Sequence, residues 1–110
     1  MGARPAVSTW LAESYSPGIR REDVAAAEER AASAVATLRG EGVAVAYLGA
    51  LLVAGDEVVF HVFEADDATS VAEAVGRAAI EVARVVEAES VPWAGGDDVV
   101  AELLRRPAQP

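Results

Sequence analysis

Four polar residues stand within otherwise apolar stretches of this chain, and their types allow chemistry: Glu13, Tyr47, His61 and Glu87. His61 is the one histidine of the sequence and lies in the middle of the run VVFHVF. Burying an unpartnered polar side chain in such a run costs roughly 2–7 kcal/mol. We therefore expect the imidazole to have a partner among Glu13, Glu87 and Tyr47, either directly or through a water molecule or an ion.

An imidazole placed between carboxylates supports two kinds of chemistry. Its nitrogen and a carboxylate oxygen suit a divalent metal such as Ni²⁺ or Zn²⁺, and we predict His61 and Glu13 as the metal ligands. Alternatively, the carboxylates raise the pKa of the imidazole and hold its tautomer for acid–base catalysis. The wider ligand-binding set is predicted to comprise all four residues, Glu13, Tyr47, His61 and Glu87, and the sequence assigns no catalytic residue.

Each of these residues also has a purely structural alternative. His61 and Tyr47 could pack in the core with ordinary hydrogen bonds, and Glu87 could be exposed on an edge strand. Glu13 could form an ion pair with Arg84 or Arg77. Because each chain has a single histidine, a site with two or three histidines would need a dimer. The sequence contains no phosphate-binding loop and no nucleophile-elbow motif.

Six elements are expected to position these residues. Runs of apolar and β-branched residues predict strands at residues 7–15, 43–53, 57–65 and 82–91. Apolar residues at i+3 and i+4 spacing predict helices at residues 22–39 and 68–79. Gly40 is expected as the C′ residue of the first helix. Asp97 or Asp98 could cap a short helix near the C-terminus.

This order of elements is the split βαββαβ pattern of the α+β class. Right-handed crossovers predict a ferredoxin-like sandwich, with a four-stranded antiparallel sheet in the order 4-1-3-2 and two helices on one face. Glu87, Glu13 and His61 then come from three adjacent strands and can converge on one face, depending on the strand register. We expect an N-terminal extension at residues 1–7, the ferredoxin-like domain at 8–91, and a C-terminal extension at 92–110 with a short helix.

Both faces of the predicted sheet are apolar. Strict alternation in the second strand places Val45, Tyr47 and Leu51 on one face, and Leu48 and Leu52 on the other. Two helices can cover one face only, so something else is expected to cover the second face. A second copy of the chain is the simplest candidate, which predicts a homodimer.

Composition limits the classes of partner. The 110 residues carry a net charge of −9 and contain no lysine, which opposes binding to nucleic acid or to an anionic membrane. The chain has no cysteine, which excludes thiolate chemistry within it. We see no signal peptide and no apolar stretch long enough to span a bilayer. The expected location is the cytoplasm.

Four segments resemble a known family: WLAESYSPG at residues 10–18, GVAVAYLG at 42–49, DEVVFHVFEA at 56–65 and ARVVEA at 83–88. Their sequences and order resemble the domain-of-unknown-function family numbered 4242, over about residues 8–91. The resemblance implies small bacterial proteins of ferredoxin-like fold, among which a nickel-binding member supplies the usual functional label. This chain departs from the family pattern near Arg20, where a Thr or Ser commonly opens the first helix.

Three functions from different classes follow, of which the third is a purely structural or partner-binding subunit. The first is a small dimeric binding protein that holds a divalent metal such as nickel, or a small ligand. The alternative is a cofactor-independent enzyme, of isomerase, cyclase or oxygenase type, acting on a small apolar substrate between sheet and helices. No organic cofactor is indicated by the sequence.

Overall fold

The computed structural model describes residues 7–89 and 91. All six expected elements are present, and their order is β-α-β-β-α-β with one 3-10 turn. The short C-terminal helix and residues 92–110 predicted from the sequence lie outside the described residues. The elements are β1 (Ser8–Tyr15), α1 (Arg21–Gly40), β2 (Val45–Val53), η1 (Ala54–Asp56), β3 (Val58–Ala65), α2 (Ala68–Arg77) and β4 (Arg84–Ala88).

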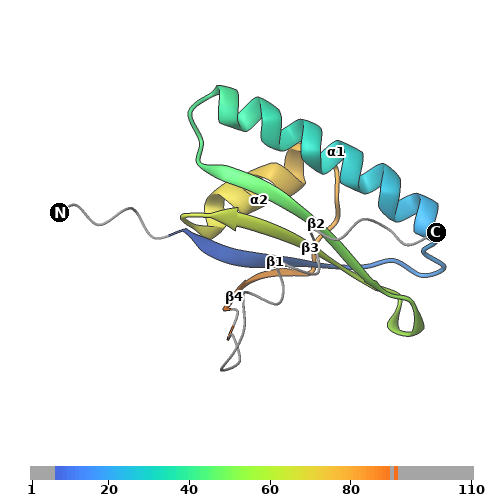
Figure 1. The fold of residues 1–110 in the computed structure, drawn as a ribbon. Helices are drawn as coiled ribbons and strands as arrows, with labels where there is room; N and C mark the ends of the chain where they lie inside the picture. The colour runs from blue at the N-terminus through green and yellow to red at the C-terminus, as the bar shows by residue number, and fades with distance from the viewer. Residues whose placement is uncertain (1–6, 90, 92–110) are drawn as a thin grey trace.

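The four strands form one antiparallel sheet in the order β2-β3-β1-β4. This is the predicted order 4-1-3-2, counted from the opposite edge. Both helices lie on the same side of the sheet, as Figure 1 shows. The described residues therefore place a helical layer on one face, which we call the helix face, and no helix on the other, which we call the open face.

The core lies between the helix face and the two helices. Leu38 of α1, Phe63 of β3 and Val71 of α2 are each at most 1% exposed and belong to one cluster. Many of the residues around them are alanines, among them Ala12 and Ala31, both fully buried. Their small side chains let the helices pack close to the sheet. Where several of them occur together, space between the elements stays unfilled.

A β-bulge at Leu48 changes the phase of β2. Tyr47 lies opposite Phe63 and Gly49 lies opposite Val62, so two residues of β2 advance against one of β3. Gly49 has φ 140°, a conformation that glycine adopts without a steric penalty. The strict alternation expected from the sequence is therefore wrong beyond Tyr47. The residues that follow exchange faces: Leu52 points to the helix face, and Leu51 points to the open face.

The ends of α1 differ from the sequence prediction in detail. Arg20, a poor N-cap residue, precedes the helix, and its backbone N–H donates to the Asp23 carboxylate at 3.0 Å. At the other end Gly40 is still helical, and Gly42 takes the left-handed conformation with φ 91°. The expectation that Gly40 is the C′ residue is therefore wrong, because the helix continues for one more residue before the chain turns. Neither helix of the described residues is long and apolar enough to cross a membrane.

Leu38 provides a test of how α1 packs. It is 1% exposed in the main cluster, so Leu38→Ala should lower the free energy of unfolding by roughly 2–4 kcal/mol. Chemical denaturation followed by circular dichroism measures the change. Thr37→Ala, at an exposed neighbouring position, is the control and should shift the same quantity by about 0.5 kcal/mol or less. A loss at Leu38 as small as the control would contradict the packing of this face.

Candidate functional site

His61 lies near the middle of β3 and points to the helix face. It is 2% exposed, and its ring nitrogen Nδ1 lies 2.9 Å from the hydroxyl oxygen of Tyr47 on the neighbouring strand β2. The two rings are tilted by 36°, with centroids 6.0 Å apart. The prediction that His61 has a hydrogen-bonding partner among Glu13, Glu87 and Tyr47 is confirmed, with Tyr47 as that partner.

A cavity of about 340 Å³ lies beside the imidazole, between the sheet, the first half of α1 and the segment that follows α2. Its polar wall includes His61, Ser14 and Arg30, and its apolar wall includes Val24, Val59 and Ile80. Ala27, between Val24 and Arg30 in α1, also lines the cavity. Its side chain is too small to fill the space. The cavity therefore follows from the alanine content of α1.

His61 lines this cavity, and Tyr47 occupies Nδ1 of its ring. Among residues 7–89 and 91, the ring forms one hydrogen bond, between Nδ1 and the Tyr47 hydroxyl. No buried side-chain nitrogen or oxygen in this part of the chain lacks a hydrogen-bond partner. Nε2 is therefore the ring nitrogen that Tyr47 does not occupy.

Burial and a nearby positive charge both keep the imidazole neutral. Loss of solvation, together with the smaller effect of the Arg30 guanidinium, lowers the pKa of His61 from 6.5 to about 4. Arg30 is held in place because its Nε donates to the carbonyl oxygen of Ala78, at the end of α2, at 2.8 Å. At pH 7 the site therefore presents an uncharged imidazole beside a fixed guanidinium.

The Tyr47 hydroxyl is also uncharged at pH 7. Burial raises the pKa of Tyr47 above its usual value, and the Glu28 carboxylate on α1 raises it further. A neutral hydroxyl can donate to a bare Nδ1, or it can accept from a protonated Nδ1. The first arrangement leaves a proton on Nε2, and the second leaves Nε2 as a bare acceptor. The same positions of the oxygen and nitrogen atoms thus allow Nε2 to act either as a hydrogen-bond donor or as a base.

The end of α2 forms the opposite wall of the cavity. Ala79 has φ 58°, in the left-handed region where a glycine is usual, which costs roughly 1–3 kcal/mol. This turn is closed by the Ile80 N–H, which donates to the carbonyl oxygen of Val75 at 3.0 Å. The turn places both Ala79 and Ile80 against the cavity.

Glu13 does not join the site. It lies opposite Phe60, whereas His61 lies opposite Ala12, so the two side chains point to opposite faces of the sheet. On the open face the Glu13 carboxylate accepts from Arg84 Nε at 2.6 Å and from the Tyr15 hydroxyl at 2.9 Å. These bonds lower the pKa of Glu13. The structure shows the structural alternative, an ion pair with Arg84.

The predicted pair of metal ligands is therefore wrong for a single chain, because the sheet separates Glu13 from His61. Across residues 7–89 and 91 no group of three or more His, Cys, Asp or Glu side chains could hold a metal ion. The cavity beside His61 also contains the Asp23 and Glu81 carboxylates, but they do not form such a group with the imidazole. Metal binding by this chain stays a prediction that would need other ligands.

Glu87 lies on the helix face, as the convergence argument required, but it is exposed. It lies opposite Trp10 on the edge strand β4, while the residue of β4 in the row of His61 is Val85. Trp10 stands between Glu87 and β3, and its indole N–H donates to the carbonyl oxygen of Ala65 at 3.0 Å. Of the four predicted ligand-binding residues, the structure brings together His61 and Tyr47.

Sequence reasoning missed Ser14 and Arg30. Ser14 is 9% exposed and lies on the helix face with His61. It stands two residues after Ala12 in β1, so strand alternation places both on one face, and the sequence did contain this signal. Arg30 falls on the polar side of α1 in a helical projection. It reaches the cavity because α2 supplies the Ala78 carbonyl, which no local pattern reveals.

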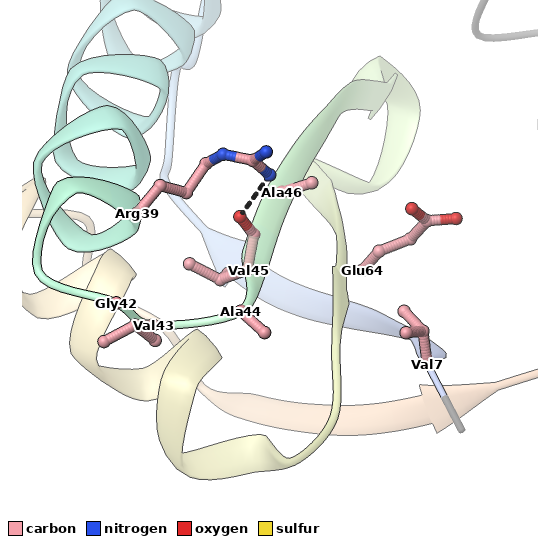
Figure 2. A pocket seen from close by; sticks show the side chains of 8 residues that line it. All are labelled: Val7, Arg39, Gly42, Val43, Ala44, Val45, Ala46 and Glu64. Carbon is pink, nitrogen blue, oxygen red and sulfur yellow. Dashed lines mark hydrogen bonds between the residues drawn. The ribbon is translucent and has the colours of Figure 1, made fainter. Parts of the chain in front are cut away.

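A second cavity, of about 440 Å³, lies at the start of β2 (Figure 2). Arg39 reaches over it from the end of α1, and its Nη1 donates to the carbonyl oxygen of Val45 at 3.2 Å. Glu64 stands on the opposite side, and both charged side chains are exposed. Most of the wall consists of alanine, glycine and valine, without a buried polar group such as His61. The cavity beside His61 is therefore the better candidate site.

Comparisons with protein-family models, with curated proteins and with solved structures gave no match for this chain. The resemblance to family 4242 stays a prediction. The functional argument consequently depends on the geometry of the His61 cavity.

The single histidine allows a direct test of this geometry. Because the folded pKa of about 4 is below the unfolded value of 6.5, the unfolded chain binds the proton more readily. The stabilisation from neutral His61 is therefore present above pH 6.5 and is lost as the pH falls toward about 4. An NMR titration of the imidazole ¹⁵N signals should give a midpoint near 4, and Arg30→Gln should raise it.

The carboxylates also titrate in this range, so His61→Gln is the control for stability. The difference in unfolding free energy between wild type and His61→Gln should change with pH between about 4 and 6.5 and be constant above this window. A midpoint near 6.5 in the folded protein would contradict the burial of the ring.

Proposed function

We propose that this chain is a small-molecule-binding protein of ferredoxin-like fold, in which His61 serves as an acid–base group for proton transfer without an organic cofactor. The observation that carries the proposal is the position of His61: a buried neutral imidazole that Tyr47 holds at Nδ1 and that lines a cavity, where we place Nε2. The element order and the sheet order β2-β3-β1-β4 support the ferredoxin-like assignment.

A packing role alone accounts less well for this arrangement. A histidine that merely fills a core has both nitrogens satisfied or solvated, and its surroundings are filled. Here Tyr47 satisfies one nitrogen, and the ring lines a space of about 340 Å³, within the range of about 300–1,000 Å³ typical of ligand pockets. Apolar walls with a few convergent polar groups and a perturbed pKa mark such a space as a functional candidate.

The proton transfer follows from the two tautomers. With Nδ1–H donating to Tyr47 Oη, the bare Nε2 takes a proton from a bound molecule and the ring becomes imidazolium. The imidazolium keeps its hydrogen bond to Tyr47, and Nε2–H then returns the proton to a second atom of the same molecule. Arg30 stabilises the negative charge that develops on the bound molecule, and burial disfavours the imidazolium, so the proton is readily released.

Diethyl pyrocarbonate, which acylates unprotonated imidazole, tests whether Nε2 is accessible. The chain has one histidine and no lysine, so acylation of the imidazole is readily assigned by mass spectrometry of peptides. We expect folded His61 to react, with a rate that is constant from pH 7 down until the pH approaches about 4. The urea-unfolded chain should instead lose reactivity around pH 6.5.

Two variants sharpen the result. Filling the cavity with Ala27→Leu should slow acylation strongly, whereas Ala36→Leu, at an exposed position of the same helix, should leave the rate unchanged. If the folded wild-type protein resists acylation, Nε2 is enclosed and the proposed function fails.

We also propose that the chain self-associates through the open face. Tyr15, Leu51 and Val53 are 57%, 44% and 40% exposed and lie on this face at the end nearest the β2–β3 connection. Neighbouring large apolar side chains exposed in this way are typical of interaction surfaces. The central residue Val62 is fully buried although it points to the same face, so the support for self-association comes from this end of the sheet.

Light scattering coupled to size-exclusion chromatography should therefore give a mass near twice the 11.4 kDa of the chain at micromolar concentration. Leu51→Asp combined with Val53→Asp should produce a folded monomer, because paired carboxylates oppose contact between two copies that each carry a charge of −9. A wild-type mass of one chain would exclude the dimer.

A further inference from the structure

We infer that the His61 cavity takes an uncharged, mostly apolar ring compound that carries one hydroxyl group, such as a simple phenol. This inference rests on the proposed function and names the class of ligand for the same site. It follows from the walls of the cavity, the charges at its rim and the two polar groups that remain available inside.

The walls favour an apolar body. Val24 and Ala27 from α1, Val59 from β3 and Ile80 from the segment after α2 line the cavity. Three of these four are β-branched and therefore stiff, so they form a preformed surface rather than an adaptable one. A volume of about 340 Å³ is at the small end of the range for ligand sites, about 300–1,000 Å³, which favours a single-ring compound.

The electrostatics disfavour a ligand of either charge. Burial is the larger cause of the lowered pKa of His61, and loss of solvation penalises cations and anions alike. Arg30 additionally opposes a cation beside Nε2. Against an anion stand the Asp23 and Glu81 carboxylates at the same cavity and the net charge of −9 of the chain.

Ser14 and His61 determine the polar group of the ligand. Ser14 lies opposite Val59 and His61 opposite Ala12, so the two are diagonal neighbours on adjacent strands, with Cβ atoms within about 7–8 Å. Both side chains line the cavity. A hydroxyl group of a ligand between them can donate to Nε2 and accept from Ser14 Oγ, which satisfies both with one polar group.

Four ring compounds of matched size test this inference: p-cresol, benzoate, benzylamine and toluene. At pH 7 the first is neutral with a hydroxyl, the second anionic, the third cationic and the fourth without a polar group. Binding is followed by the imidazole ¹⁵N signals and by protection of His61 from diethyl pyrocarbonate. We expect p-cresol to bind roughly 2–100-fold more tightly than toluene, the range of one or two ordinary hydrogen bonds, and more than tenfold more tightly than either ion.

Ser14→Ala should weaken p-cresol roughly 2–10-fold and leave toluene unchanged, whereas Ser33→Ala, on the exposed side of α1, should alter neither. Tightest binding of benzoate or benzylamine at His61 would overturn the ligand class while leaving the proposed function intact. Absence of p-cresol binding in protein whose His61 still reacts with diethyl pyrocarbonate would also overturn the ligand class. Failure of that reaction in the free protein would instead defeat the proposed function itself.

Discussion

The hydrogen bond of 2.9 Å between Tyr47 Oη and His61 Nδ1 joins β2 to β3 beneath helix α1. Tyr47 also packs edge-on against Phe63, with ring centroids 5.1 Å apart. Without the tyrosine, the apolar core would contain an imidazole with an unsatisfied nitrogen, which costs about 1–3 kcal/mol. With it, Nδ1 has a partner, and the ring is held beside the cavity.

The sheet separates two polar systems that the sequence does not distinguish. On the helix face, a neutral imidazole and a neutral phenol share a hydrogen bond in poorly solvated surroundings. On the open face, Glu13 is bound by the charged Arg84 and by Tyr15. The first system keeps its charge at zero and is open to a cavity, whereas the second is an ion pair whose bonds are already made. Chemistry is therefore expected on the helix face and structural stabilisation on the open face.

Element types and strand order could be predicted because their signals are local. Apolar runs, the helical spacing along α1 and the short hairpin connection each depend on neighbouring residues. The partner of His61 could be limited to three residues by the cost of burial alone. The choice among them depended on register, and in β2 register depends on the bulge at Leu48, which moves Leu51 and Leu52 to unexpected faces. Arg30 was missed because its contact, the Ala78 carbonyl, lies 48 residues away along the chain.

Strand β2 lies at the edge of the sheet, and its nine residues include neither a charged residue nor a proline. Such an edge is a template for strand addition by other molecules. Two features already described protect it: the Leu48 bulge interrupts its regular spacing, and Arg39 occupies the Val45 carbonyl from outside. The opposite edge, β4, is five residues long and carries Arg84 and Glu87. The last turn of α1 thus takes part in protecting this edge, because it carries Arg39.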